Sequence, residues 1–482
     1  MKESGWQLEH SYAGLPDVFY KETQPETAEF PEIVLFNWNL AKSLGLDPRN
    51  LQLESSEVFS GNRIPDGGLP IAQAYAGHQF GNFTMLGDGR AILLGEQITP
   101  EGRRVDIQLK GAGRTVFSRM GDGRSPLGPM LREYIISEAM HALDIPSTRG
   151  LALVTTGEAV SRDRMLPGAV LTRVAASHLR VGTFEYAARL EDASHIRTLA
   201  DYAMERHYPE IEVPDKYLKF LDAVIDRQAA LISRWQLVGF IHGVMNTDNM
   251  TISGETIDYG PCAFMDMYDP ETVFSSIDVN KRYRYRNQPG IAQWNLARLA
   301  ETLLPLIHDD KEEAMKIAQA SLGNFGKLYN NYWQSGMRRK IGLVGGEEID
   351  DSLANELLDL MHQYKADFTK TFRMLSLDAL EDMPLYATEA FKNWYERWQE
   401  RLESQRLPVE SAYEQMRSVN PAVIPRNHLV EEALDAAVEN GDFTKASKLI
   451  EVLSSPFEDG HDRMFKEPPE DEERVHMTYC GT

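Results

Sequence analysis

The sequence predicts an α+β protein with a sheet-rich first part and a mostly helical second part. Glycine and β-branched residues crowd the region from about residue 74 to 174, whereas the second half carries amphipathic helix patterns. The composition, with 42% hydrophobic and 26% charged residues, is that of an ordinary globular protein and excludes a fibrous or low-complexity chain. The length of 482 residues corresponds to about three domains of average size.

The charge balance excludes several classes of partner. The chain has 50 Lys and Arg residues against 73 Asp and Glu residues, a net charge of −23, which disfavours tight binding to nucleic acid or to an anionic membrane surface. The N-terminus has no apolar stretch of signal-peptide length, and no segment approaches about 18 consecutive apolar residues. We therefore expect a bacterial-type cytoplasmic monomer without nucleic-acid or membrane partners.

The first predicted elements form a hairpin with a glycine-rich tip. Residues 83–86 are predicted as a strand, Gly87 to Arg90 as a turn, and residues 91–94 as the returning strand. Residues 104–110 then alternate polar and apolar side chains over the length of a strand. This pattern places Lys110 at the end of a third strand.

A glycine-rich loop over residues 111–129 leads into a predicted helix at 130–143. Apolar residues in this segment recur with the spacing of one helical face, and the helix carries Glu133. The elements predicted next are strands at 151–155 and 169–174, a long helix after Pro214, a polar loop from His242 to Asn249, and a short hairpin over 250–257 that leads to Asp258-Tyr259-Gly260.

The second half is predicted to be helical as far as about residue 454. The helical patterns span 291–307, 311–335, 351–377, 387–404, 408–417 and 427–454. Residues from about 455 onward are rich in Pro, Asp and Glu, and we expect them to form a flexible tail.

Five of these features follow the order of a protein-kinase-like nucleotide site: the glycine-rich tip, the strand lysine, the helix glutamate, the polar loop and the Asp-Tyr-Gly turn. A triphosphate needs close backbone N–H groups, a cation and a metal held by oxygen atoms. In this interpretation Lys110 is the cation and pairs with Glu133, while Asn249 and Asp258 hold Mg²⁺. We therefore predict a protein-kinase-like two-lobed fold, with a mixed β-sheet N-lobe and an enlarged, mostly helical C-lobe.

The pattern departs from a protein kinase at the catalytic aspartate. When the polar loop is aligned with that of a kinase, the aspartate position holds Val244, and the nearest carboxylate is that of Asp248. Arg173 and Arg180 flank the expected hinge and Arg90 ends the glycine-rich tip, so the predicted cleft is strongly cationic.

Four long segments carry a resemblance to one family. They are Ala74–Glu96, Gln108–Val154, His242–Met250 and Ile257–Asp266. Through them, and over nearly its whole length, the chain closely resembles the selenoprotein O family of pseudokinase-like protein adenylyltransferases. Eukaryotic members carry selenocysteine third from the C-terminus, where this chain has Cys480, so it resembles a bacterial member without selenium.

The resemblance implies an activity and a set of site residues. ATP is expected to lie reversed relative to a kinase, so that AMP passes to protein Ser, Thr or Tyr hydroxyls and pyrophosphate is released. Asp248 is the expected proton acceptor, Glu133 pairs with Lys110, and Asn249 and Asp258 are the expected ligands of Mg²⁺, with Mn²⁺ as the alternative metal. The expected ATP contacts are Gly87, Gly89, Arg90, Lys110, Asp122, Gly123, Arg173 and Arg180.

Other activities stay open at this point. The polar loop and the Asp-Tyr-Gly turn also resemble kinase-like phosphotransferases, which transfer the γ-phosphate to a protein or a small molecule. Val244 at the catalytic position suits a pseudokinase that only binds ATP. Transfer of UMP from UTP with Mn²⁺ is a further alternative, because the base contacts cannot be inferred from motifs.

The expected organisation follows from these assignments. An N-terminal extension (1–70) packs on the lobes, the N-lobe spans 71–175, the helical C-lobe spans 176–455, and the tail spans 456–482. The two cysteines, Cys262 and Cys480, are the basis of one more hypothesis. They form a reversible disulfide that ties the tail to the segment after Asp258 and makes activity depend on redox state.

Overall fold

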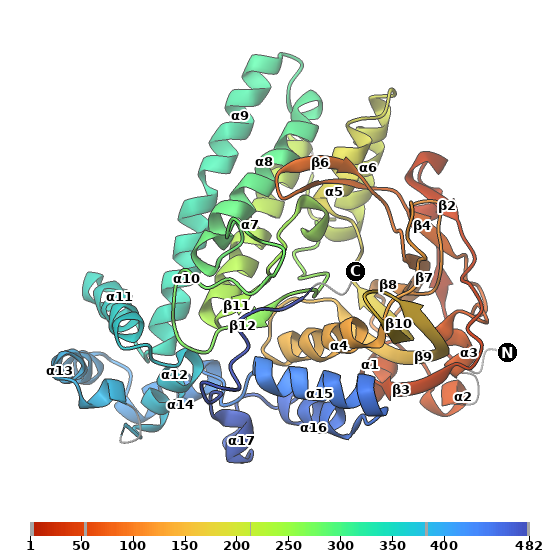
Figure 1. Cartoon of the computed structure of the whole chain (residues 1–482). Coiled ribbons are helices and arrows are strands. Elements are labelled where there is room, and N and C mark those ends of the chain that lie inside the picture. Colours follow the sequence, from red (N-terminus) through yellow and green to blue (C-terminus); the bar gives the residue numbers. More distant parts are fainter. Residues whose placement is uncertain (1–3, 53–54, 213, 381–383, 480–482) are drawn as a thin grey trace.

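The computed structural model describes residues 4–479 apart from 53–54, 213 and 381–383. Strands dominate the first part of these residues and helices the second, which confirms the predicted α+β class (Figure 1). Within the same residues, no helix combines the length and apolar character needed to cross a bilayer.

The main sheet of the described residues has eight antiparallel strands. Its order is β2 (Tyr20–Glu22), β4 (Ile71–Gln73), β7 (Ala91–Ile98), β8 (Arg104–Lys110), β10 (Met165–Ala175), β9 (Arg149–Ser161) and β3 (Glu32–Phe36), and β1 (Leu8–Glu9) pairs with β7. The first 70 residues thus supply both edge strands, β2 and β3. The sequence pattern of that region predicts neither strand.

The register of the central strands places the charged residues of the first part on one face. The predicted strand at 104–110 is confirmed as β8, in which Lys110 lies between Ala91 of β7 and Leu171 of β10. Arg173 of β10 lies opposite Gln108. Because side chains alternate between the faces of a strand, Gln108, Lys110 and Arg173 share one face, and α4 (Leu127–Ala142) covers it.

The opposite face of the sheet is apolar. Ile107 and Leu109 of β8 are fully buried there, in a cluster with Leu94 of β7 and Val154 of β9. The helices on this side are α1 (Trp38–Ser43), α2 (Pro48–Gln52) and α3 (Ser55–Ser60). The alternation that points Lys110 toward α4 therefore also anchors its strand in a hydrophobic core.

The predicted hairpin with a tip at Gly87 to Arg90 is wrong. β6 (Asn82–Met85) pairs with β5 (Ala76–Gln79) and not with β7. The turn is at Phe80 and Gly81, which both have positive φ, 50° and 88°, as a two-residue hairpin of this type requires. Residues 87–90 instead link this small hairpin to β7, and the hairpin extends from the sheet toward α5 (Val181–Ala187) in Figure 1.

The second part is helical, and the long helix predicted after Pro214 is confirmed as α7 (Lys216–Leu237). Three of the longer predicted helices are each two helices, with breaks at Asn324, at residues 364–367, and at Gly441, whose φ of 64° ends a helix. The remaining bounds are α6 (Ser194–His207), α8 (Gln288–Ile307), α9 (Lys311–Gly323), α10 (Phe325–Lys340), α11 (Glu348–Gln363), α12 (Phe368–Leu377), α13 (Glu389–Ser404), α14 (Val409–Val419), α15 (Asn427–Asn440) and α16 (Thr444–Leu453).

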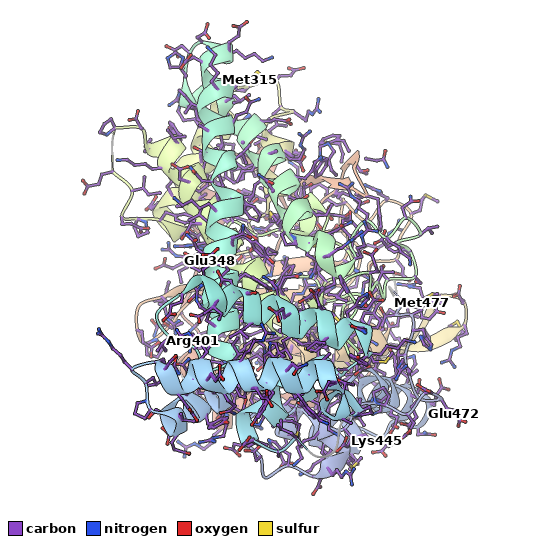
Figure 2. The ribbon with its side chains drawn as sticks, turned by 90° about the vertical axis from the view of Figure 1, so that its left-hand side faces the viewer. Met315, Glu348, Arg401, Lys445, Glu472 and Met477 are labelled. Atoms are coloured by element: carbon purple, nitrogen blue, oxygen red, sulfur yellow. The ribbon has the colours of Figure 1, made fainter. Side chains whose placement is uncertain are left out.

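Helices α10 to α14 enclose a core of their own, centred on the buried and stacked rings of Trp394 and Trp398. Figure 2 labels Glu348 of α11 and Arg401 of α13 in this group of helices, and Met477 on the other side of the view. The Arg401 guanidinium pairs with the Asp350 carboxylate at 2.8 Å, which links α13 to α11.

Two short strands align the polar loop with the segment that follows Asp258. β11 (Phe240–Ile241) pairs with β12 (Ala263–Phe264), which brings residues 242–249 beside residues 258–262. The hairpin predicted over 250–257 is not formed. Thr251 and Thr256 make isolated bridges to Arg180 and Ser147 instead, so this segment is a tight turn held by its neighbours.

Residues 455–479 are packed, contrary to the prediction of a flexible tail. They include α17 (Arg463–Lys466), and the buried Thr478 forms a bridge with Ser275. The Thr478 hydroxyl donates to the carbonyl oxygen of Pro261 at 2.6 Å, so this part of the chain lies against the segment that follows Asp258. Cys480 lies outside the described residues.

Candidate active site

A cavity of about 320 Å³ lies where the main sheet, the β5–β6 hairpin and the 242–249 loop meet. The predicted site residues among its walls are Gly89, Arg90, Lys110, Arg173, Arg180, Asp248, Asn249 and Asp258. A second cavity of about 420 Å³, between α1 and residues 141–149, contains none of the predicted site residues. The chemistry-bearing side chains therefore converge on the first cavity.

Four charged side chains form a closed cluster at its inner end. The Lys110 ammonium lies 2.7 Å from Glu133 Oε2 and 3.1 Å from Asp258 Oδ1. The Arg173 guanidinium contacts the same two carboxylates. Lys110 comes from the end of β8, Arg173 from β10 and Glu133 from α4, so the sheet register and the covering helix create the cluster.

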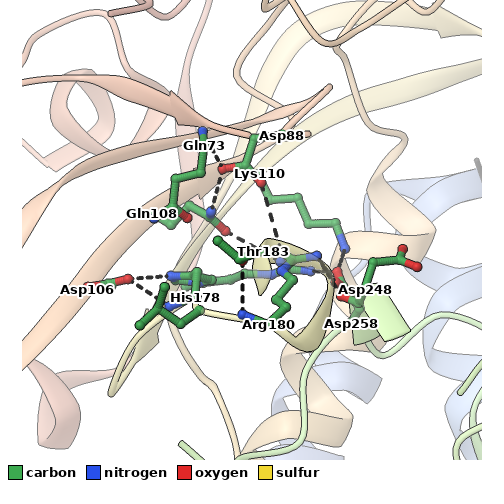
Figure 3. Close-up of polar contacts among 12 residues, drawn as sticks. Gln73, Asp88, Asp106, Gln108, Lys110, His178, Arg180, Thr183, Asp248 and Asp258 are labelled. Carbon is green, nitrogen blue, oxygen red and sulfur yellow. Dashed lines mark hydrogen bonds and ion pairs between the residues drawn. The ribbon is translucent and has the colours of Figure 1, made fainter. Parts of the chain in front are cut away.

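Arg180 joins this cluster from the residue before α5. Its Nη1 donates to Asp258 Oδ2 at 3.1 Å and to the backbone carbonyl of Asp248 at 3.0 Å, and its guanidinium lies 4.5 Å from the centre of the Tyr75 ring. Asp258 therefore binds three cations, and Figure 3 shows Lys110 and Arg180 meeting it from two sides.

The cations set the protonation of the carboxylates. Burial raises the pKa of Asp258, but Arg173, Lys110 and Arg180 hold it well below its usual value. Arg173 and Lys110 outweigh burial in the same way and lower the pKa of Glu133. Burial and the neighbouring Arg173 lower the pKa of Lys110. Lys110, Arg173 and Arg180 thus bring three cations to one end of the cavity, which suits a polyphosphate.

Asp248 lies next to Arg180, which donates to its backbone carbonyl, and under the β5–β6 hairpin. The Gln79 amide donates to Asp248 Oδ2 at 3.4 Å, whereas the buried Oδ1 has no hydrogen-bond partner. Burial raises the pKa of Asp248 to about 6, against the opposing effect of Arg180. A carboxylate oxygen that is desolvated and unpartnered is chemically competent to accept a proton from a substrate hydroxyl.

The donor set of the cavity fits a hard divalent cation. Asn249 and Asp258 both line the cavity, and the Asn249 amide nitrogen donates to the Val244 carbonyl at 2.9 Å, which leaves the amide oxygen as its ligand atom. Among the described residues, no group of three or more His, Cys, Asp or Glu side chains could hold a metal ion. A cation here would therefore use the asparagine together with carboxylate and phosphate oxygens.

Comparisons of the sequence with known proteins identify one family. The family described as "Protein adenylyltransferase SelO" matches residues 4–454. The chain belongs to the SelO family. It is also 58% identical to the "Protein nucleotidyltransferase YdiU" of Bacillus cereus and to that of Bacillus thuringiensis, over 100% of this chain and 99% of each relative. These matches confirm the expected family and the expected enzyme class, a nucleotidyltransferase.

Three other expected ATP contacts of the SelO family do not line the cavity. Gly87 packs against the Phe117 ring, where a Cβ would lie 2.4 Å from the ring carbon, so its lack of a side chain allows the 113–125 loop to approach. Asp122 is partly exposed and pairs with Arg162 at 2.8 Å, and Gly123 packs against the backbone of Gly113. These three residues lie in the loops around Gly89 and not on the cavity wall.

Several cavity residues of this SelO-family chain were missed by the pattern analysis. Tyr75 and Gln79 lie within a segment that the resemblance rests on, but neither matches a phosphate- or metal-binding pattern. Asp88 is buried, accepts a hydrogen bond from Gln108 at 3.3 Å and lies 3.9 Å from Arg180. The sequence signal that could have identified Asp88 was its position between Gly87 and Gly89 in the expected glycine-rich tip.

Proposed function

We propose that this chain transfers AMP from ATP to Ser, Thr or Tyr hydroxyls of proteins and releases pyrophosphate, as a cytoplasmic monomer. The observation that carries the proposal is that one cavity brings together three cations and a carboxylate with an unpartnered oxygen. Lys110, Arg173 and Arg180 converge on Asp258, and Asp248 lies next to Arg180 with its Oδ1 unpartnered. This arrangement suits a phosphate chain bound inward and an acceptor hydroxyl that enters beside Asp248.

The reaction follows from these positions. The acceptor hydroxyl oxygen forms a bond to the α-phosphorus of ATP, the bond from that phosphorus to the bridging oxygen breaks, and pyrophosphate leaves. Asp248 accepts the hydroxyl proton, while Lys110, Arg173 and Arg180 stabilise the charge on the leaving phosphates. Asn249 and Asp258 would hold Mg²⁺ or Mn²⁺, which would neutralise phosphate charge when bound.

We propose that the fold around this site is kinase-like and two-lobed. The N-lobe is residues 71–175 with the N-terminal extension 1–70 against it, and the C-lobe is residues 176–455. Support comes from the pair between the strand residue Lys110 and the helix residue Glu133 (2.7 Å), and from a loop and an Asp-Tyr-Gly turn supplied by the helical part. Reversed binding of ATP is consistent with Val244 at the position of a kinase catalytic aspartate.

Labelling distinguishes the candidate reactions. The purified chain is incubated with a protein mixture and ATP labelled at either the α- or the γ-phosphorus. Protein-bound label from the α position supports adenylylation. Label from the γ position alone would support the second candidate, a kinase-like phosphotransferase, which the Lys110–Glu133 pair favours. Label from neither would leave a pseudokinase that only binds ATP. Competition between labelled ATP and UTP under Mg²⁺ and Mn²⁺ tests UMP transfer.

We also propose that Cys262 and Cys480 form a reversible disulfide that gates activity. Thr478 contacts Pro261, the residue before the buried Cys262, so the described end of the tail already reaches this segment. In the oxidation step both thiols lose their protons, and two electrons pass to an oxidised disulfide such as that of glutathione. Equal activity with and without reductant, in the wild type and in Cys480→Ala alike, would rule the gate out.

A further inference from the structure

The segment that supplies Ile277 to the cavity wall also carries two cations, Lys281 and Arg282, that have no acidic partner among the described residues. Arg282 lies 4.9 Å from the centre of the Trp294 ring and beside Gly81 at the tip of the β5–β6 hairpin. Among the described residues no carboxylate pairs with Arg282 or with the exposed Lys281, and the buried Nε of Arg282 has no hydrogen-bond partner. In a chain of net charge −23, two such cations beside a cavity indicate an anionic group that binds there.

The same segment exposes apolar side chains on a fixed turn. The buried carboxylate of Asp278 accepts hydrogen bonds from the backbone N–H groups of Arg282 and Tyr283, both at 2.8 Å. This cap holds residues 277–281 in place, although the side chains of Ile277 and Val279 are 48% and 87% exposed. Branched apolar side chains presented on a rigid turn are suited to contact with another protein.

This surface is continuous with the Asp248 side of the cavity. Ile277 itself lines the cavity. The Tyr283 hydroxyl donates to Asn246 Oδ1 at 2.8 Å, and the backbone N–H of Phe80 donates to the same oxygen at 3.0 Å. Asn246 is two residues before Asp248. A chain that lies on residues 277–282 can therefore place a hydroxyl next to Asp248.

We infer that Ile277, Val279, Lys281 and Arg282 form an acceptor surface, which selects protein segments carrying an acidic residue and an apolar residue beside the modified hydroxyl. The acidic side chain pairs with Lys281 and Arg282, and the apolar one packs on Ile277 and Val279. The inference rests on the proposed function and adds the class of acceptor sequence to it.

The test uses matched peptides and the full-length chain. Two peptide pools contain one Tyr, Ser or Thr within randomised flanks, one pool enriched in Glu and the other in Lys, and both are offered with α-labelled ATP. The wild type should label the acidic pool about tenfold more efficiently. Lys281→Glu/Arg282→Glu should lower labelling of the acidic pool and raise that of the basic pool, with an unchanged KM for ATP.

Controls separate the possible failures. Lys281→Glu alone changes an exposed side chain and should shift the ratio of acidic-pool to basic-pool labelling in the same direction but by less. This single variant keeps the test valid if the double variant does not fold. Lys327→Glu, at an exposed position of α10, should leave the ratio unchanged. Equal labelling of both pools by the wild type, or a charge reversal that alters only the KM for ATP, would overturn the acceptor surface. Transfer of no α-label to any protein or peptide would overturn the proposed function and the acceptor surface with it.

Discussion

Removal of the Asp258 carboxylate should destabilise the protein as well as abolish transfer. In Asp258→Ala three cations, Lys110, Arg173 and Arg180, each lose the carboxylate that pairs with them. Loss of one partner from a buried ion pair costs about 3–5 kcal/mol, and the 21% exposure of the Asp258 side chain favours the lower end, about 3 kcal/mol.

Lys110→Met provides the contrast. It removes one cation, and Glu133 and Asp258 both keep Arg173 as a partner, so the expected cost is about 1 kcal/mol. Urea unfolding of the nucleotide-free protein measures both variants, with Asp222→Asn at an exposed position of α7 as the matched control. Inorganic triphosphate should restore part of the stability of Asp258→Ala, because an added anion replaces the lost charge. Equal costs for the two variants, or a wild-type midpoint for Asp258→Ala, would refute the reasoning.

Three further predictions concern the loop residue, the hairpin and the helical core. Asp248→Asn should lower the transfer rate by about 10²–10⁴ with ATP binding retained, measured by α-label transfer and by titration of ATP; an unchanged rate would remove Asp248 as the base. A Cβ at Gly77 would lie 2.4 Å from Asp248 Oδ1, so Gly77→Ala should slow transfer by about tenfold or more, whereas Gly290→Ala, with open space around it, should not. Burial lowers the pKa of Lys340 from 10.5 to about 7. Above pH 7 the unfolded chain therefore binds more protons at Lys340 than the folded chain, so the free energy of unfolding should rise with pH, by up to about 1.4 kcal/mol per pH unit. Unfolding at several pH values should show this rise in the wild type and not in Lys340→Met.

The elements with a clear local pattern could be predicted. Alternation over 104–110 gave the bounds of β8, and the 3.6-residue period gave α4 and α7 nearly in full. The partner of the strand before Gly87 could not be predicted. The hairpin turns at Phe80 and Gly81, where φ is positive, whereas the glycine-rich composition of residues 87–90 indicates a turn there instead. A periodic apolar face likewise continues across Asn324, where the chain starts a new helix.

The site was predictable as a set of residues but not as a geometry. Order along the chain indicated that Lys110, Glu133 and Asp258 belong together. The convergence of three cations on Asp258 depends on contacts between residues 78 to 148 positions apart, which no local pattern encodes. The same holds for Thr478, which packs on Pro261 from 217 positions away although the composition of its segment is typical of a flexible tail.

The position of the transferred label tests the central claim most directly. The purified wild-type chain is incubated with acceptor protein, divalent metal and ATP labelled at the α- or the γ-phosphorus in parallel. The proposed function predicts protein-bound label from the α position only, together with one released pyrophosphate for each labelled hydroxyl. Protein-bound label from the γ position, with none from the α position, would contradict it.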